Sequence, residues 1–417
     1  MQNYDVIIFG GGTAGCACAW NCGRLGLKTL LIEKEAYLGG TMTGSLVIPI
    51  MKSGDNQINT DFYNELVNEM HKACAQVTYQ GNSGWFNPFI LKTVLLDMLH
   101  EAGVDIHLGT EMLSLYNDMI YSNNTIIRIE TLSEYIEAKY FVDATGNLDF
   151  CEKIGCKFLP LPDEFQPMNL RFIMDGVDLK TFGDWLLTID SDRNVTAVEE
   201  IDGQTHLSTA YTWDSNKHWA LAQYFEKAVQ DKVLKDTDRN YFQVFTVAGM
   251  KNGLAFNCPR IVENLNPLDK NDLKTAYNIG KEAIERIANF CKLYFPGFNN
   301  AYIYKIADEV GIRASRQIKG KYIYTIEDLR SSKNFENPAV ISSYPVDVHS
   351  RDKNSSTLEA NGEYQLPIES LMSNDFDNLY VAGRGLSADK LAQGALRVQA
   401  SCFSMGEAIA KHIKSRI

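Results

Sequence analysis

The chain has 417 residues, of which 45% are hydrophobic and 22% charged, the composition of a globular protein long enough for about two domains. The formal net charge of −12 argues against a nucleic-acid or anionic membrane partner, although a local group of arginines can still bind a small anion. No apolar run reaches the roughly 18 residues of a membrane span. The chain opens directly on the strand-like run Val6–Phe9, without the features of a signal peptide, so we expect a cytoplasmic protein.

The nine cysteines are scattered and contain no C-x-x-C pair, so a disulfide framework is not expected. The local group Cys16, Cys18 and Cys22 admits an iron–sulfur interpretation. The spacing of Ala14, Cys18, Cys22 and Leu25 instead favours one face of a helix packed on a sheet, where a free cysteine behaves as a small apolar residue. We therefore predict no metal site.

The hydrophobic pattern predicts alternating helices and strands at both ends of the chain. Residues 4–33 are typical of a strand, a tight turn, a helix and a second strand. Further along, the pattern predicts a helix within 61–80, a helix over 90–102, a strand over 104–108, a small β-meander through 111–143, a buried strand before Gly146, another over 378–383 and a helix from Gln393 onward. Residues 157–370 are richer in aromatic residues and contain no nucleotide-binding loop.

The first motif with a chemical meaning is Gly10-Gly11-Gly12-Thr13-Ala14-Gly15, a G-x-G-x-x-G between a strand and a helix. Such glycines allow a tight turn and let the backbone approach a pyrophosphate at the helix N-terminus. Glu33 closes the next strand 18 residues after Gly15, where an acid accepts hydrogen bonds from a ribose diol and disfavours a 2′-phosphate. Together they predict a dinucleotide site that does not take NADP.

Two further segments favour FAD over NAD in this site. The glycine pair Gly39-Gly40, just after the acidic strand, suits close contact with a cofactor that continues past the pyrophosphate. Near the C-terminus, Val381–Arg384 precedes a helix expected to start near Leu396. The N-terminus of that helix is expected to face the pyrimidine edge of a flavin, where its partial positive charge stabilises the negative charge that reduction brings.

With these motifs in place, the chain resembles the FAD-dependent oxidoreductases of the glutathione-reductase-like flavoproteins, some of which carry a loose xanthan lyase label. The matching segments lie along nearly the whole chain: 10–15, 33–35, 38–41, 143–149, 311–316, 344–349, 382–387 and 395–399. They are specific for the family and not for a substrate.

The resemblance implies that 144–146 pass near the adenine half of FAD, that Met112 contacts adenine, and that Gly383 and Arg384 lie at the pyrophosphate and ribityl chain. Many related flavoproteins have Gly-Asp at that last point, and the Arg384 of this chain puts the acidic ribityl contact in doubt. The full expected cofactor set is Gly10, Gly12, Thr13, Ala14, Gly15, Glu33, Lys34, Gly39, Gly40, Thr41, Met112, Ala144, Thr145, Gly146, Gly383, Arg384, Leu396, Arg397 and Val398.

The substrate side of the sequence carries less information. Arg313 and Arg316 lie three residues apart, on one face if that stretch is helical, and are expected to anchor a substrate through their planar donors. His349 follows a strand-like run and is expected to act as acid or base. Purely structural roles, such as salt bridges for the arginines, remain open alternatives for all three.

These observations predict an α/β fold: a Rossmann-like, three-layer β-β-α FAD-binding domain with a parallel sheet and β-meander, carrying an inserted α+β substrate or cap domain. The FAD domain is expected at 1–44, 90–155 and 372–417, and the cap at 45–89 and 156–371. The expected reaction is hydride transfer between flavin N5 and a small organic substrate between the domains, with an unidentified electron donor or acceptor. The alternatives are a non-redox or purely binding flavoprotein and a pyridine-nucleotide-linked reductase, for which a second nucleotide motif and a redox cysteine pair are missing.

Overall fold

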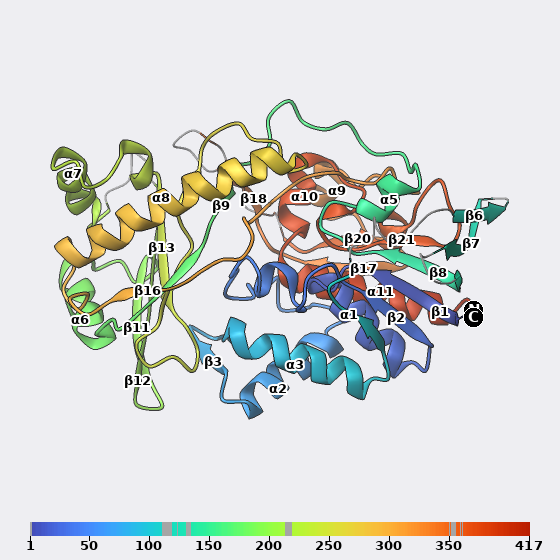
Figure 1. Ribbon diagram of the computed structural model, residues 1–417, viewed down its shortest axis with the longest axis horizontal. Coiled ribbons are helices and arrows are strands. Elements are labelled where there is room, and N and C mark those ends of the chain that lie inside the picture. The colour runs from blue at the N-terminus through green and yellow to red at the C-terminus, as the bar shows by residue number, and fades with distance from the viewer. Residues whose placement is uncertain are drawn as a thin grey trace.

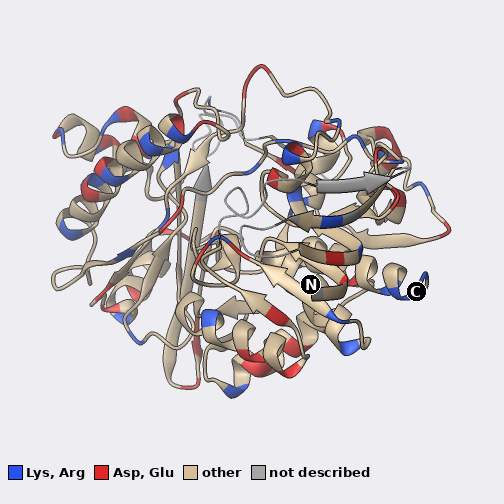
Figure 2. Cartoon of the chain, turned by 45° about the vertical axis from the view of Figure 1, so that its right-hand side comes forward, with Lys and Arg blue, Asp and Glu red and all other residues tan. Residues whose placement is uncertain are grey.

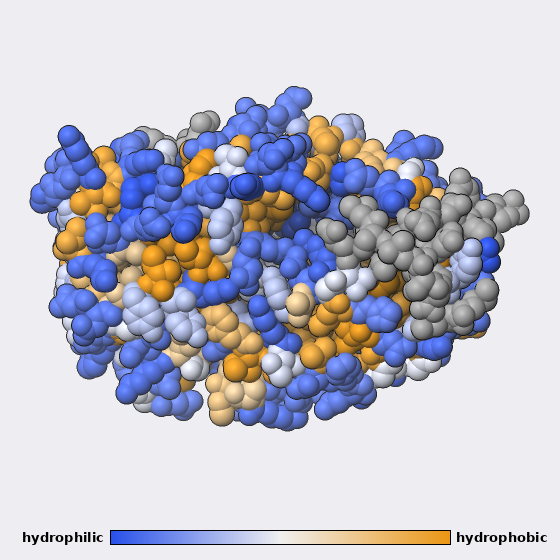
Figure 3. Space-filling view, in the orientation of Figure 1, coloured by the Kyte–Doolittle hydropathy of each residue, from blue (hydrophilic) through white to orange (hydrophobic). Residues whose placement is uncertain are grey.

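The computed structural model describes residues 2–110, 119–122, 124–130, 135–212, 219–349, 351, 356–358, 360 and 362–417. Figure 1 shows two lobes, one built around a mostly parallel sheet that holds both ends of the chain and one around an antiparallel sheet from the middle of the chain. Hydrophilic residues cover much of the face shown in Figure 3, with smaller apolar areas among them. None of the described helices has both the length and the apolar character that crossing a membrane requires.

The first sheet has the order β5-β2-β1-β8-β7-β6, with β21 also paired to β8. The parallel strands are β1 (Gln2–Phe9), β2 (Thr29–Ile32), β5 (Asp105–His107), β8 (Tyr135–Asp143) and β21 (Leu379–Val381). Antiparallel strands β6 (Met119–Ser122) and β7 (Thr125–Glu130) extend the sheet from the start of β8. Strands buried on both faces need nearly continuous apolar residues, as Val6–Phe9 and Leu30–Ile32 provide. The predicted α/β class with a parallel sheet and an antiparallel extension is confirmed.

Four helices pack together beside this sheet: α1 (Thr13–Arg24), α2 (Asp61–Lys72), α3 (Pro88–Glu101) and α11 (Gln399–Lys414). Helix α3 begins where Asn87 accepts hydrogen bonds from the backbone N–H groups of Phe89 and Ile90, with Pro88 in the first turn. Cys16, Cys18 and Cys22 are buried free thiols in α1, as the helical interpretation expects. All nine cysteines are free.

The second sheet is antiparallel with the order β11-β12-β13-β14-β10-β16. Its strands are β10 (Phe172–Asp175), β11 (Thr196–Ile201), β12 (Gln204–Thr212), β13 (Tyr241–Thr246), β14 (Leu254–Phe256) and β16 (Tyr302–Ile306). Its helices are α6 (Leu179–Ile189), α7 (Ala222–Gln230) and the long α8 (Lys270–Tyr294), which in Figure 1 runs from this lobe toward the other. Edge-on and tilted phenylalanines such as Phe225, Phe242 and Phe295 form its core.

Shorter elements complete the fold. They are the pairs β9 (Met168–Asn169) with β15 (Arg260–Ile261), β17 (Pro338–Ser342) with β20 (Tyr364–Pro367) and β18 (Val346–Val348) with β19 (Ser356–Leu358), and the helices α5 (Asp149–Lys153), α9 (Ile326–Arg330) and α10 (Lys390–Leu396). Of these, α5, α9, α10, β17 and β20 lie in the lobe of the parallel sheet (Figure 1).

The segment over 61–86 differs from the sequence prediction. The helix expected within 61–80 ends at Lys72, and the hairpin β3 (Gln76–Tyr79) and β4 (Asn82–Phe86) follows it. Helix α2 packs on α11 through Phe62 and Phe403, whose ring centroids are 5.1 Å apart. The hairpin reaches the second sheet, where the Tyr79 hydroxyl donates to the Ala197 carbonyl oxygen at 2.8 Å. Residues 45–89 therefore contact both lobes. The division of the chain into an FAD domain and a cap domain stays a prediction.

Candidate functional site

A cavity of about 960 Å³ lies between the carboxyl ends of the parallel strands and one face of the second sheet. Phe9, Ile32, Ala144 and Ala382, which end or follow four of the parallel strands, line one side of it. Tyr241 of β13 and other residues of the second sheet line the opposite side. Ligands of open parallel sheets bind at this strand edge, and the volume is at the upper end of the range for small-molecule and cofactor sites.

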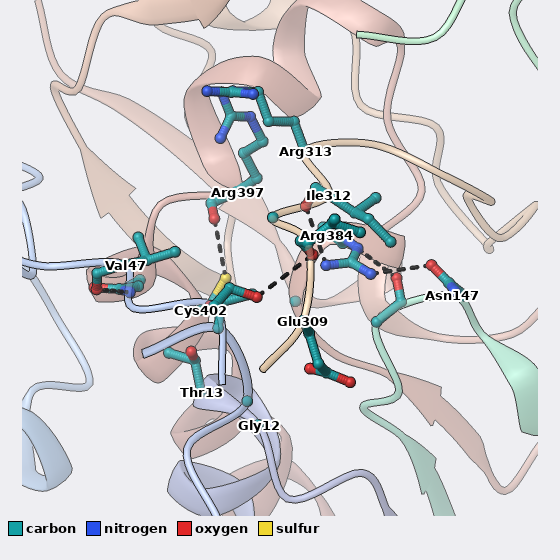
Figure 4. Close-up of a pocket in the computed structure, with 18 of the residues that line it drawn as sticks. Gly12, Thr13, Val47, Asn147, Glu309, Ile312, Arg313, Arg384, Arg397 and Cys402 are labelled. Carbon is teal, nitrogen blue, oxygen red and sulfur yellow. Dashed lines mark hydrogen bonds between the residues drawn. The ribbon is translucent and has the colours of Figure 1, made fainter. Parts of the chain in front are cut away.

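The three motif glycines of the first loop meet different steric constraints. A Cβ on Gly10, whose φ is +94°, would lie 2.7 Å from the Thr145 nitrogen, and a Cβ on Gly15 would lie 1.8 Å from the Gly10 oxygen. A Cβ on Gly12 would meet only the Gly40 Cα, at 3.9 Å. Gly10 and Gly15 are therefore required by the fold, whereas Gly12 opens on the cavity (Figure 4) and keeps room for a ligand.

Helix α1 begins at this loop without a side-chain cap, since Gly12 occupies the N-cap position. Thr13 and Ala14 line the cavity at the first turn of the helix. The first N–H groups of a helix have no intrahelical partner and carry a partial positive charge, so this end of α1 fits a phosphate group.

Glu33 is buried, and both of its carboxylate oxygens accept backbone hydrogen bonds. Oε2 accepts from the Gly11 N–H at 2.6 Å and Oε1 from the Glu35 N–H at 2.9 Å. Burial raises the pKa of Glu33, although these hydrogen bonds act in the opposite direction. Glu33 thus fixes the glycine loop as well as facing the cavity, and its remaining lone pairs can accept from ribose hydroxyls. The neighbouring Lys34 also lines the cavity, and its ammonium pairs with Glu309 at 3.2 Å.

The second glycine pair places its loop directly against the first loop. Gly39 has a φ of +100° and Gly40 a φ of +50°, and a Cβ on Gly40 would lie 2.8 Å from the Gly12 Cα. The Gly39 N–H donates to the Gly11 carbonyl oxygen at 2.8 Å. Gly40 and Thr41 line the cavity, whereas Gly39 lies outside the lining and holds the two loops together through this hydrogen bond.

The end of β8 forms the next part of the wall. The buried carboxylate of Asp143 accepts from the Thr145 N–H, the Thr145 hydroxyl and the Cys151 N–H, and burial raises the pKa of Asp143 to about 6. Ala144, Thr145 and Gly146 line the cavity in the turn that these bonds hold.

Arg384 fixes the same turn from the C-terminal side. Its guanidinium donates to the Gly146 oxygen at 2.6 Å, to Asn147 Oδ1 at 3.0 Å and to the Ile312 oxygen at 3.2 Å (Figure 4). Burial lowers the pKa of Arg384 to about 10. Arg384 and Gly383 both line the cavity. At this position the chain therefore has a cation whose donors face neutral oxygens, and no acidic side chain.

The C-terminal part of the site contains a break between two helices. The helix expected to continue through Leu396 ends there as α10, and α11 begins at Gln399 after Arg397 and Val398. Leu396 is fully buried and does not line the cavity, whereas Arg397, Val398 and Gln399 do. Val398 provides no side-chain cap, so the N-terminus of α11 also opens on the cavity.

Arg397 is paired at this break. One Nη2 nitrogen donates to the Asp347 backbone oxygen at 2.9 Å and to Asp347 Oδ2 at 3.0 Å. Burial opposes ionisation of Asp347, but the hydrogen bond from His349 and the charges of Arg397 and Arg313 hold its pKa below the ordinary value. The arginine and aspartate are therefore both charged.

Of the three residues predicted for the substrate side, Arg313 and His349 line the cavity and Arg316 does not. Arg313 is buried in the cavity wall and donates to the Pro167 carbonyl oxygen. Arg316 is absent from the wall; it forms an ion pair with Glu152 and donates to the Asn147 oxygen at 3.2 Å. The segment around them is not helical, so a spacing of three does not place them on one face.

His349 lies in the wall, but both of its ring nitrogens are engaged. Nε2 is 3.1 Å from Asp347 Oδ2, and Nδ1 is 2.9 Å from an Nη2 nitrogen of Arg260. Burial and the charge of Arg313 lower the pKa of His349 to about 3, so the ring is neutral near pH 7. The arrangement favours a positioning role for His349 over proton transfer by the ring.

Sequence reasoning missed a polar network on the second sheet. Asn257 Oδ1 accepts from Arg171 Nε, and its Nδ2 donates to the Tyr241 hydroxyl at 3.0 Å and to Gln243 Oε1 at 2.6 Å. All four residues line the cavity. No motif marks them, because they come from three segments that are far apart in the sequence: β13, the residue before β10 and the residue after β14. The predicted adenine contact Met112 lies outside the described residues.

A family model described as FAD dependent oxidoreductase matches residues 5–414. The chain belongs to the FAD-dependent oxidoreductase family. It is an enzyme of this class, with FAD as its cofactor, and the glycine loops, Glu33 and the two uncapped helix N-termini fit that cofactor.

Individual relatives match shorter parts of this oxidoreductase. It is 52% identical over 46 residues to dihydrolipoyl dehydrogenase of Bacillus subtilis (strain 168), covering 11% of this chain and 10% of that protein. It is 24% identical over 174 residues to 1H-pyrrole-2-carbonyl-(peptidyl-carrier protein) brominase of Pseudoalteromonas luteoviolacea (strain 2ta16), covering 37% and 40%. The matched stretches thus span from about a tenth to less than half of these relatives.

Among solved structures, a geranylgeranyl bacteriochlorophyll reductase-like protein from Thermoplasma acidophilum is 15% identical, with a TM-score of 0.48 over 100% of this chain and 79% of that one. A flavin-dependent brominase is 14% identical, with a TM-score of 0.49 over 100% of this chain and 79% of that one.

Replacing Gly12 tests the cofactor end of the cavity. We expect Gly12→Leu to purify folded but without bound FAD, because a side chain there fills ligand space and clashes with no nearby protein atom at its Cβ. Flavin absorbance relative to protein, with circular dichroism as the check on folding, measures this. A folded variant with a full complement of FAD contradicts the assignment of this space to the cofactor.

The charges at the start of α11 test the flavin end. Arg397→Met is expected to lower the reduction potential of the bound flavin, and Asp347→Asn to raise it, since a cation favours added negative charge and an anion opposes it. One charge at a helix end contributes about 0.3–1 kcal/mol, or roughly 6–22 mV for a two-electron couple. Arg397→Lys keeps the charge and serves as the control in an equilibrium dye titration. Equal potentials in all four proteins show that the pair lies too far from the flavin to act on it.

The low pKa of His349 predicts a pH-dependent stability. The unfolded chain binds a proton at this residue below its ordinary value of 6.5, but the folded protein does so only near 3, so the free energy of unfolding falls as the pH drops through this window. The depressed pKa of Asp347 acts with the same sign at lower pH. We expect the stability advantage of wild type over His349→Asn to shrink from about pH 7 to about pH 4 in urea denaturation. Exposed His100→Asn is the control, and a constant difference refutes the prediction.

Proposed function

We propose that this oxidoreductase transfers a hydride between flavin N5 and a small organic substrate bound between the two sheets. The observation that carries the proposal is the single cavity that extends from the glycine loop to the polar face of the second sheet. When bound, FAD supplies two-electron chemistry at N5, taking a hydride from a substrate carbon or delivering one to it. In this proposal, the residues of the second sheet and of 311–349 bind and orient the substrate.

Arg313 supports this division of roles. Its side chain is 7% exposed and lines the cavity, and the one hydrogen bond that a described residue accepts from it is to a backbone oxygen. Its remaining nitrogens can donate to a substrate. In our proposal Arg313 anchors the substrate, whereas Arg316, which pairs with α5, is left out of the substrate site.

Tyr344 is our proposed proton donor. It lines the cavity, and its hydroxyl forms no hydrogen bond with a described residue. Burial raises the pKa of Tyr344 to about 12, so the hydroxyl holds its proton near pH 7 and can give it to an oxygen or nitrogen that gains an electron pair. Asp347 and His349 hold the adjoining strand against Arg397 and Arg260 and so position the hydroxyl.

The function itself is tested by anaerobic titration of the FAD-loaded protein with small organic donors, and of the photoreduced protein with acceptors, followed by flavin absorbance. Bleaching by one member of a redox pair and recolouring by the other supports the proposal. Turnover of a substrate that neither needs nor changes the oxidation state of the flavin overturns it in favour of a non-redox role.

Tyr344→Phe is expected to keep FAD and to slow flavin oxidation or reduction by substrate about 10²- to 10⁴-fold, because the proton donor is lost. Tyr302→Phe, on the exposed edge strand β16, is the matched control and is expected to behave as wild type. Stopped-flow absorbance measures the rate. A Tyr344→Phe rate within a few-fold of wild type removes this residue from the proposed chemistry.

A further inference from the structure

The arginines at the second-sheet end of the cavity differ in how they are held. Arg171 and Arg313 are 8% and 7% exposed and line the cavity together with Arg397. Arg397 has a carboxylate partner in Asp347, as the structural Arg286 has in Asp238. Within the described part of the chain, no carboxylate forms a salt bridge with Arg171 or Arg313. Their guanidinium groups are held by neutral partners, Asn257 and the Pro167 carbonyl oxygen.

The consequence is an excess of positive charge in a buried place. Among the described residues, three arginines and the carboxylate of Asp347 line this end of the cavity, and His349 is neutral near pH 7. Burying an uncompensated charge costs several kcal/mol by general estimates, and like charges close together add to that cost. Burial lowers the pKa of Arg313, and the charges of Arg397 and Arg171 lower it further, so these arginines repel one another. An anion in the cavity relieves this.

The side chains that carry the free donors of Arg171 and Arg313 line the same cavity. Figure 4 shows the guanidinium groups of Arg313 and Arg397 close together above the loop that carries Ile312. Gly311, two residues before Arg313 in the chain, lies close to Arg171, since a Cβ there would be 3.0 Å from Arg171 Nη1. The Nη atoms of Arg171 form no hydrogen bond with a described residue and belong to a side chain that lines the cavity. Planar guanidinium donors match the two oxygens of a carboxylate.

We propose that the substrate is a small organic carboxylate, held through its carboxylate group by Arg171 and Arg313. This inference rests on the proposed function, because it takes the bound carboxylate to be the substrate. It adds to that function the chemical class of the substrate and a binding role for Arg171. Asn257, Tyr241 and Gln243 are positioning residues in this site: they hold Arg171 by neutral hydrogen bonds and leave its charge for the ligand. The acidic side chains of Glu33 and Glu309 lie with Lys34 at the nucleotide end of the cavity.

The experiment measures binding without turnover. FAD-loaded protein is titrated with acetate and succinate and, in parallel, with acetamide and succinamide, while the flavin difference spectrum and the melting temperature are recorded. We expect the carboxylates to shift both in a saturable way and the neutral amides to have no such effect, because only an anion compensates the arginines.

Variants locate the effect. Arg171→Gln and Arg313→Gln are expected to keep FAD and to raise the half-saturating carboxylate concentration about 10- to 100-fold. Arg171→Lys keeps the positive charge and is expected to raise this concentration less than Arg171→Gln does. Arg330→Gln, an exposed arginine on α9, controls for net charge and is expected to match wild type. If one glutamine variant does not fold, Arg171→Lys and the glutamine variant of the other arginine still test whether these arginines bind the carboxylate.

Three results overturn the proposal: carboxylates that act no better than their amides, variants that bind carboxylates like wild type, and variants that lose FAD or shift its reduction potential while carboxylate binding is unchanged. The last result assigns the arginines to the cofactor. Hydride transfer is tested separately, by the donor and acceptor titrations, so specific carboxylate binding supports this inference even if those titrations find no redox change of the flavin.

Discussion

The close contact of α1 with β1 and with α11 is the constraint on which the cofactor end of the cavity depends. A Cβ on Gly15 would lie 1.8 Å from the Gly10 oxygen, and a Cβ on Gly406 would lie 2.3 Å from the Ala14 oxygen. Neither contact leaves room for a methyl group, so the two helices and the strand are held in one arrangement. Both helices begin at the cavity wall, and neither first turn has a side-chain cap. Two partial positive charges therefore act on the same space.

The opposite wall of the cavity carries the full positive charges of arginine side chains, whereas the first wall has the partial positive charges of helix N-termini. The protein carries a net charge of −12, and Figure 2 shows acidic and basic residues spread over its outer helices. Against that background Arg171 and Arg313 keep a local excess of positive charge by being buried and held by neutral groups. A surface arginine is screened within about 10 Å at 0.1 M salt, whereas a buried one is screened much less. The net charge of the chain therefore gives little information about the sign of its ligand.

The sequence predicted the parts of the site whose chemistry is local. The loop around Gly12, the acid Glu33 and the turn after Asp143 each follow a buried strand and impose a backbone conformation that their own residues reveal. The relation between Arg313 and Arg316 was not predictable in this way. Both lie in one short motif, but the backbone there is not helical, and the two side chains point to different neighbours. The sequence also missed the hairpin after α2, because Thr60 to Tyr79 contains apolar spacings that suit either structure.

The network that holds Arg171 shows why the substrate wall could not be deduced from motifs. Phe172 pairs with Phe256 and Val244 pairs with the same Phe256, so the next position in the register places Asn257 between Arg171 and Gln243. The hydrogen bonds follow this row of the sheet. Each residue is an ordinary polar side chain in or next to a strand, and only the pairing of β10, β14 and β13 places them side by side. Neutral amides in such a row can orient a guanidinium without cancelling its charge, which an aspartate at 257 would do.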